Sequence, residues 1–155
     1  MCYISFKGNP VKASRLFAGY EHEEAVKKLA AQFNKPHDYY TTVSFDANLL
    51  VTHETETYES AYHQLMATIV HQQVTSTNLV LRGTAVRKIF VDGGFSKNQM
   101  YMQLLTDSFP EIKIYAASIP QASALGAALA INQYWNEKNI PIDIIELKYY
   151  APAIR

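Results

Sequence analysis

The residues best suited to chemistry in this sequence lie in one short stretch, residues 91–98, which reads VDGGFSKN. An apolar run from Arg87 to Val91 stops at the pair Gly93 and Gly94 and turns at once into a helical pattern. Glycine lets a backbone come close to a ligand where a β-carbon would collide, and the helix that follows directs its free N–H groups at negative charge. The stretch therefore indicates a nucleotide pocket.

Asn98 is the polar side chain best placed to add specificity to this turn. It follows the glycine pair closely, so we expect it one turn into the next helix, where its amide can reach a ligand that rests on Gly94. Ser96 is expected to cap that helix, and Asp92 to hydrogen-bond the turn. The spacing leaves open the alternative that Asn98 is an exposed helix residue and that the glycines only form a turn. The pair fits neither the dinucleotide nor the phosphate-loop glycine motif.

A second segment, residues 121–130, reads QASALGAALA and consists almost entirely of small side chains. A helix with so little bulk on one side lets another backbone or a flat ligand approach it closely. Tight packing of this helix on a sheet is the alternative explanation. The acidic residues of the chain are scattered, and none stands beside a histidine or a second acid in an arrangement typical of acid–base catalysis. No catalytic base is therefore assigned.

The composition excludes several classes of protein. The 155 residues, 48% of them hydrophobic, suffice for one compact core, so a single domain over residues 1–155 is expected. Fourteen basic and fourteen acidic side chains cancel, which argues against nucleic acid as a partner. No apolar run could span a membrane and no signal pattern opens the chain, so a cytoplasmic protein is expected. The single Cys2 and the five histidines offer no metal-type spacing, and we expect the histidines at surface or capping positions.

The elements that must position these residues alternate in the order of an α/β protein. Apolar periodicity predicts four helices, over residues 21–33, 57–80, 97–109 and 121–137. Apolar runs predict strands over 87–91 and 112–116, with a further short β-element at 2–6 and a possible return strand at 11–17. Residues 39–52 are expected to be a loop with a little strand, and an apolar tail begins at Ile140.

Charge patterning supports the first of these helices. Glu21, Glu23 and Glu24 are expected in its first turn, where the helix dipole favours acidic groups. Lys27 and Lys28 each follow one of these acids at i,i+4 spacing, which predicts two ion pairs along the helix surface.

Residues 91–98, followed by the A-L-G-A-A sequence at 124–128, resemble the C-terminal domain of FGGY-family carbohydrate kinases, with rhamnulokinase-like and fuculokinase-like members nearest. The resemblance covers nearly all of the chain. It implies the C-terminal half of an actin-like (ribonuclease H-like) ATPase fold, a central sheet with flanking helices. It also implies that the turn at Gly93 and Gly94 cradles the phosphates of ATP or ADP, and that Asn98 and the Gly126 helix flank the adenine.

Two departures from the family's pattern limit what the chain is expected to do alone. Gln121 stands where the family usually has Glu at the start of the last helix. The family's catalytic Asp and its Thr/Gly phosphate turn lie upstream of the region that matches residues 1–6, as does most of the sugar site. The expected function is therefore the nucleotide-binding part of an ATP-dependent sugar kinase, which would act with Mg²⁺ on a ketose such as rhamnulose, fuculose or xylulose. Alone, the chain is expected to be inactive, and no catalytic or metal-binding residue is assigned.

The resemblance also suggests where a partner would bind. The face toward the absent sugar-binding domain is expected to be apolar, with Phe6, Phe17, Tyr39 and Tyr40 on it, and exposure of this face would drive self-association. Two alternatives to a kinase fragment remain. One is a non-catalytic nucleotide-binding module on the same half-fold, and the other is a structural interaction domain without nucleotide affinity.

Overall fold

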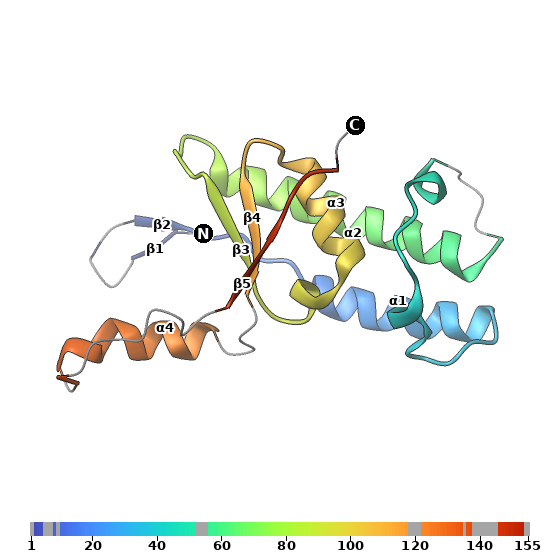
Figure 1. Ribbon diagram of the computed structural model, residues 1–155, viewed down its shortest axis with the longest axis horizontal. Coiled ribbons are helices and arrows are strands. Elements are labelled where there is room, and N and C mark those ends of the chain that lie inside the picture. Colours follow the sequence, from blue (N-terminus) through green and yellow to red (C-terminus); the bar gives the residue numbers. More distant parts are fainter. Residues whose placement is uncertain are drawn as a thin grey trace.

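The computed structural model describes residues 2–4, 8, 10–51, 56–117, 122–134, 136–137 and 146–153. Its elements, with η marking a 3₁₀ helix, follow in the order β1 (Cys2–Ile4), β2 (Pro10–Lys12), α1 (Ala18–Gln32), η1 (Tyr39–Thr42), η2 (Ala47–Leu50), α2 (Tyr58–Leu81), β3 (Lys88–Val91), η3 (Gly94–Lys97), α3 (Gln99–Ser108), β4 (Lys113–Ala117), α4 (Ala122–Ile131), η4 (Asn132–Tyr134) and β5 (Leu147–Tyr150) (Figure 1). The predicted α/β class is confirmed.

The main sheet has three strands in the order β3-β4-β5, with β3 parallel and β5 antiparallel to β4. One face is apolar and packs on the helices, since Ile114 is fully buried and its neighbour Ile89 packs against the same core. On the other face Phe90 stacks on Tyr115, with ring centroids 5.4 Å apart, and Phe90 remains 55% exposed. Alternation of side chains along each strand separates the two faces.

Near both ends of the chain the strands differ from those that the sequence predicts. The segment predicted at 11–17 forms a strand only at its start, where β2 pairs with β1 as an antiparallel hairpin separate from the main sheet. The apolar tail ends in β5, which periodicity did not predict because only a few residues of it alternate. The start of that tail, residues 140–145, lies outside the described residues.

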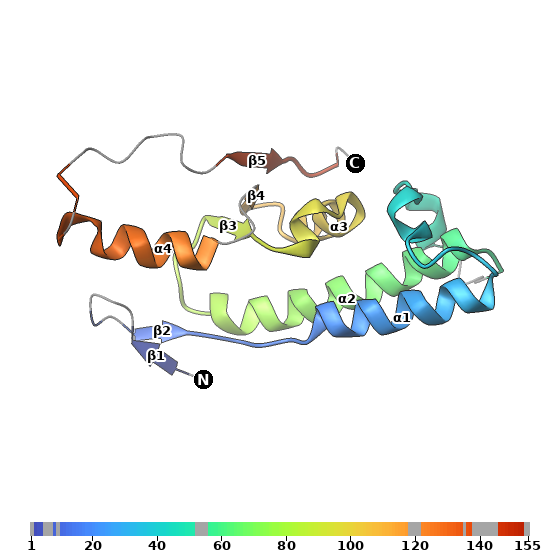
Figure 2. The same ribbon diagram turned by 90° about the horizontal axis from the view of Figure 1, so that it is seen from below.

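Helices α1 and α2 lie side by side as one layer, and α3 packs against both α2 and the sheet (Figure 2). Their facing sides bury the largest apolar side chains of the core, including Val26 of α1, Met66 of α2 and Met102 of α3. The predicted helix over 57–80 is confirmed as α2, and a capping box formed by Thr57 and Ser60 begins it, with the Ser60 N–H donating to Thr57 Oγ1 at 3.1 Å.

The first helix begins earlier than the sequence predicts. Because α1 starts at Ala18, Glu21 lies in its first turn, as predicted, whereas Glu23 and Glu24 fall beyond it. The dipole argument for these two acids was therefore wrong, because it placed the helix start at Glu21. The helix ends as predicted before Asn34, which adopts a left-handed φ of 51°.

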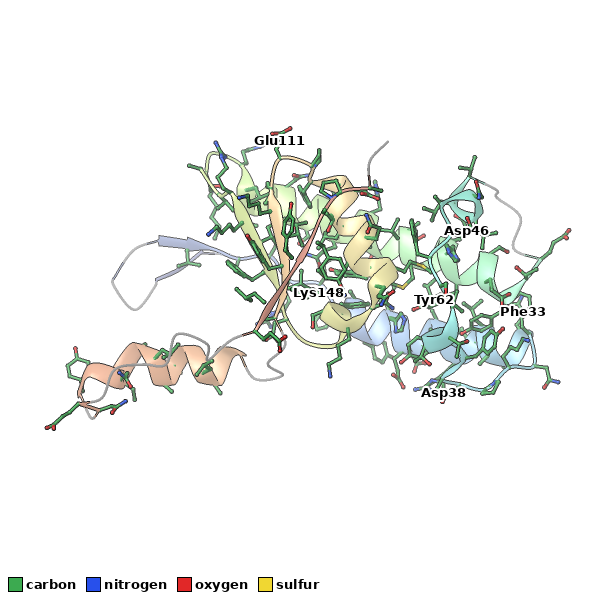
Figure 3. The ribbon with its side chains drawn as sticks, in the orientation of Figure 1. Phe33, Asp38, Asp46, Tyr62, Glu111 and Lys148 are labelled. Carbon is green, nitrogen blue, oxygen red and sulfur yellow. The ribbon has the colours of Figure 1, made fainter. Side chains whose placement is uncertain are left out.

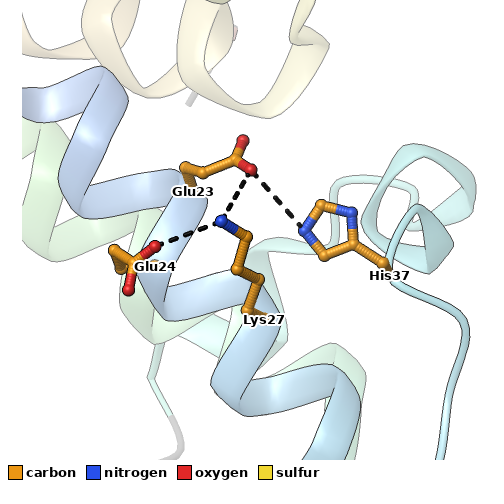
Figure 4. Close-up of polar contacts among 4 residues, drawn as sticks. All are labelled: Glu23, Glu24, Lys27 and His37. Carbon is orange, nitrogen blue, oxygen red and sulfur yellow. Dashed lines mark hydrogen bonds and ion pairs between the residues drawn. The ribbon is translucent and has the colours of Figure 1, made fainter.

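Ion pairs on the surface of α1 converge on one lysine (Figure 4). Lys27 Nζ lies 3.0 Å from Glu23 Oε1, as predicted, and 3.1 Å from Glu24 Oε1. Glu24 thus pairs with Lys27 in place of the predicted Lys28. His37 Nε2 approaches Glu23 Oε1 at 4.0 Å. Since all these side chains are substantially exposed, water screens the pairs and they contribute little to stability.

The segment after α1 is helical rather than strand-like. Residues 39–51 contain η1 and η2 and no strand, which corrects the prediction of a loop with a little strand. His63 of α2 holds this segment in place: its Nε2 accepts a hydrogen bond from the Asp46 N–H at 2.9 Å, and its Nδ1 lies 2.6 Å from the Glu59 carbonyl oxygen. His63 is fully buried, so the expectation that every histidine is at the surface or a cap was wrong.

Helix α4 lies at the opposite end of the molecule from η1 and η2 (Figures 1 and 2). It covers Ala122–Ile131 and is followed by η4, so it is shorter than the predicted helix over 121–137. Gln121 lies outside the described residues. Gly126 is exposed, and a β-carbon added to it would meet no atom within 4 Å, so no described backbone packs tightly there. Among the described residues, no helix is long and apolar enough to cross a membrane.

Candidate functional site

A cleft of about 680 Å³ lies where α1, η1, α2 and the start of α3 meet. Its lining includes Gly94 and Asn98, two of the predicted site residues, together with Lys97 between them. Tyr62, labelled in Figure 3, lies at this meeting point of the helices. The volume falls within the range of about 300–1,000 Å³ that is usual for ligand sites. A second cavity, of about 430 Å³ between residues 14–19 and β3, contains neither Gly94 nor Asn98.

The two glycines of the pair, Gly93 and Gly94, have different structural roles. Gly93 has a φ of 81°, which side chains other than glycine rarely adopt, and its N–H donates to Asp92 Oδ1 at 2.7 Å. Asp92 therefore stabilises the turn, as predicted. Gly94 is outside the positive-φ region, and a β-carbon added there would meet no atom within 4 Å. Gly93 is needed for the turn, whereas Gly94 leaves room at the wall of the cleft.

The start of α3 differs from the prediction. The 3₁₀ helix η3 stands between the glycine turn and α3, so α3 begins at Gln99 instead of Lys97. Ser96 lies inside η3, where its hydroxyl donates to the Gly93 carbonyl at 2.8 Å, and it is not the cap of α3. The cap is Asn98, whose Oδ1 accepts the Tyr101 N–H at 3.0 Å. Asn98 thus lies at the very start of the helix and not one turn into it.

The side chain of Asn98 also contacts the wall of the cleft. Its Nδ2 donates to the Tyr62 hydroxyl at 2.8 Å, and that hydroxyl lies 3.2 Å from His22 Nε2. Burial raises the pKa of Tyr62 to about 12, so its hydroxyl is protonated at neutral pH. Burial also lowers the pKa of His22 from its ordinary value of 6.5, against the attraction of Glu23, so its imidazole is neutral there.

Aromatic rings form much of the cleft wall. The ring of His22 meets those of Tyr40 and Phe95 edge to face, with centroids 5.0 and 5.6 Å apart, and Phe95 stacks on Tyr101 at 4.5 Å. Such rings offer flat apolar faces and polar edges to a planar ligand. Nothing in the sequence marked His22, Tyr40 or Phe95 as site residues. They come from three separate elements, and only the tertiary fold brings them together.

The remaining predicted residues lie apart from the cleft. Gly126 is on α4 and does not line it, so its place beside a nucleotide stays a prediction. None of the described residues that line the cleft has a carboxylate side chain. In the described part of the chain, no group of His, Cys, Asp and Glu side chains is arranged to hold a metal ion. The cleft offers a planar apolar wall and a lysine, which suit a flat anionic ligand.

The four aromatic residues predicted to face another domain are not equivalent. Phe17 is 70% exposed. Tyr39 and Tyr40 are half-buried and pack against the core, and Tyr40 also lines the cleft. Phe6 lies outside the described residues. Of the three that the structure describes, Phe17 is the one left mainly to solvent.

Residues 23–133 match the sequence model of the FGGY family of carbohydrate kinases, C-terminal domain. The chain belongs to this family. The matched region runs from α1 to η4 and contains Gly93, Gly94, Asn98 and Gly126. The family's C-terminal domain implies an actin-like ATPase fold, with which the three-stranded mixed sheet and the helices of this FGGY chain are compatible. No curated protein and no solved structure shows a significant match to the FGGY chain.

Proposed function

We propose that this FGGY chain binds ATP and ADP in the cleft, as the nucleotide-binding part of an ATP-dependent sugar kinase. The observation that carries the proposal is that the fold brings Gly94, Lys97 and Asn98 to one cleft with aromatic walls. Members of the family use ATP, generally with Mg²⁺. The sugar, by the rhamnulokinase-like and fuculokinase-like sequence pattern, would be a ketose such as rhamnulose, fuculose or xylulose.

The proposed nucleotide lies with its phosphates at Gly94 and its base against the aromatic wall. The absence of a side chain at Gly94 leaves space for phosphate oxygens, and Lys97 supplies positive charge beside them. His22, Tyr40 and Phe95 provide the flat surface that a purine prefers. The cleft thus offers space and charge for the phosphates and a flat surface for the base.

We propose that catalysis needs groups beyond this cleft. The γ-phosphoryl group, Mg²⁺ and the sugar hydroxyl must be positioned together for transfer, and a carboxylate must take the hydroxyl proton. Since no carboxylate is found among the described residues that line the cleft, those residues do not suit direct coordination of Mg²⁺. In the proposal a sugar-binding domain supplies the base and the sugar site, and this chain alone binds nucleotide without turnover.

Calorimetric titration of the purified chain with ADP and Mg²⁺ tests the proposal. Gly94→Val should abolish binding because its side chain occupies the phosphate end of the cleft, while its circular dichroism spectrum stays that of the parent. Lys97→Ala should weaken binding, and Lys113→Ala serves as the matched control, since Lys113 is an exposed lysine on β4 that does not line the cleft. Absence of heat with the parent chain up to millimolar ADP, or equal affinity in Gly94→Val, would contradict nucleotide binding and favour a structural domain.

A further inference from the structure

We infer that His22 recognises the base of a nucleotide bound in the cleft, by donating a hydrogen bond from its Nδ1–H to an acceptor on that base. In this arrangement Asn98 and Tyr62 are positioning residues that hold His22 in the required tautomer. The inference rests on the proposed nucleotide site and goes beyond it, because it assigns base recognition to a residue outside the glycine turn. In this inference His22 recognises the base in place of Asn98, the residue that the family resemblance placed beside adenine.

The first step is the orientation of the Asn98 amide. Its oxygen accepts the Tyr101 N–H at 3.0 Å as the cap of α3. A backbone N–H can only donate, so the oxygen is fixed at that position and the nitrogen must point the other way. The amide nitrogen therefore donates to the Tyr62 hydroxyl, 2.8 Å away.

The second step concerns the direction of the hydrogen bond between the Tyr62 hydroxyl and His22. Its oxygen already accepts a hydrogen from Asn98, and its own hydroxyl hydrogen then serves the contact of 3.2 Å with His22 Nε2. In the inferred arrangement Tyr62 donates this hydrogen to His22, whose Nε2 is then unprotonated. A neutral imidazole with a bare Nε2 carries its hydrogen on Nδ1. The cap of α3 thus determines the tautomer of a residue on α1.

The third step compares the donors that remain for a ligand. The Asn98 oxygen, one of its two amide N–H groups and the Tyr62 hydroxyl all take part in the chain of hydrogen bonds. His22 is half-buried, lines the cleft, and has no hydrogen bond from Nδ1 to a residue that the structure describes. A purine base carries ring nitrogens that accept hydrogen bonds. The Nδ1–H of His22 is therefore a donor within the aromatic wall that can meet such a nitrogen.

Two isosteric variants separate the nitrogens of His22. In His22→Asn the amide nitrogen takes the place of Nδ1 and keeps the donor toward the ligand. In His22→Gln the amide group reaches the place of Nε2 and keeps the contact with Tyr62 only. Both variants lose the imidazole ring from the aromatic wall, so the comparison is between the two: titration with ADP should show about tenfold weaker binding for His22→Gln than for His22→Asn, the usual cost of one lost hydrogen bond. Equal affinities, or weaker binding by His22→Asn, would overturn the inference.

A measurement without nucleotide keeps this result separate from the proposed function. Imidazole ¹⁵N NMR of the free chain should show His22 as the Nδ1–H tautomer, and Tyr62→Phe should shift it to the Nε2–H tautomer. Tyr101→Phe is the matched control, because Tyr101 is also a buried tyrosine but is not among the described ring or hydrogen-bond partners of His22. An Nε2–H tautomer in the parent chain would overturn the inference even if ADP binds. Failure of the parent to bind ADP, with the Nδ1–H tautomer present, would contradict the nucleotide site instead, and base recognition by His22 with it.

Discussion

Asn98 and Tyr62, 36 positions apart in the sequence, are joined by a hydrogen bond of 2.8 Å between the Asn98 amide nitrogen and the Tyr62 hydroxyl. One end of the amide caps α3 while the other holds a side chain near the start of α2. The start of α3 and the wall of the cleft therefore cannot change independently. A substitution at either residue is expected to alter both the stability of the helix junction and the shape of the site.

Variants of Asn98 separate its two contacts. Asn98→Ala removes the cap and the bond to Tyr62 and should lower the free energy of unfolding by about 2 kcal/mol. Asn98→Asp keeps an oxygen for the Tyr101 N–H but loses the donor to Tyr62, so it should cost less. Urea denaturation measures both. In a Tyr62→Phe background the Asp substitution should cost less still, and an unchanged cost would show that the hydrogen bond contributes nothing.

The two glycines of the turn should respond differently to alanine. Gly93→Ala forces a side chain into a φ of 81° and should destabilise the chain by about 1–2 kcal/mol. Gly94→Ala meets neither an unfavourable φ nor a nearby atom, so stability should stay near that of the parent. Paired chemical denaturation curves test the difference. Equal losses in the two variants would contradict the division of roles between them.

The glycine turn was predictable because its signal is local. A strand that ends in two glycines restricts the backbone in a way that neighbouring residues alone reveal, and the order of helices and strands follows from periodicity of the same short range. The position of Asn98 was not predictable in the same way. The 3₁₀ helix between Gly94 and Lys97 delays the start of α3, and helix boundaries of this kind depend on packing as well as on sequence.

The aromatic wall lies beyond what sequence patterns can predict. His22, Tyr40 and Phe95 come from α1, η1 and η3, and no fixed spacing links them. The burial of His63 was missed for a related reason. Its two hydrogen-bond partners, the Asp46 N–H and the Glu59 carbonyl, are backbone groups, and a sequence does not show which backbone groups a fold leaves available.

His63 is predicted to be an important internal anchor. His63→Leu leaves the Asp46 N–H without its acceptor and should lower the free energy of unfolding by about 1–3 kcal/mol. The exposed His71 on the same helix is the control, and His71→Leu should have little effect. Denaturation followed by tyrosine fluorescence measures both variants. A loss in His71→Leu as large as that in His63→Leu would assign the effect to the helix and not to the anchor.

Alkaline pH should destabilise the chain through two buried tyrosines. Burial raises the pKa of Tyr62 and Tyr101 from 10.0 to about 12, so between these values the folded state holds protons that the unfolded state has lost. Stability is therefore unaffected by these groups below pH 10 and falls as the pH rises toward 12. Denaturation curves across this pH range should show that the free energy of unfolding falls less steeply for Tyr101→Phe than for the parent, because the variant has one ionisable buried tyrosine fewer. If the falls are parallel, ionisation of Tyr101 is not coupled to unfolding.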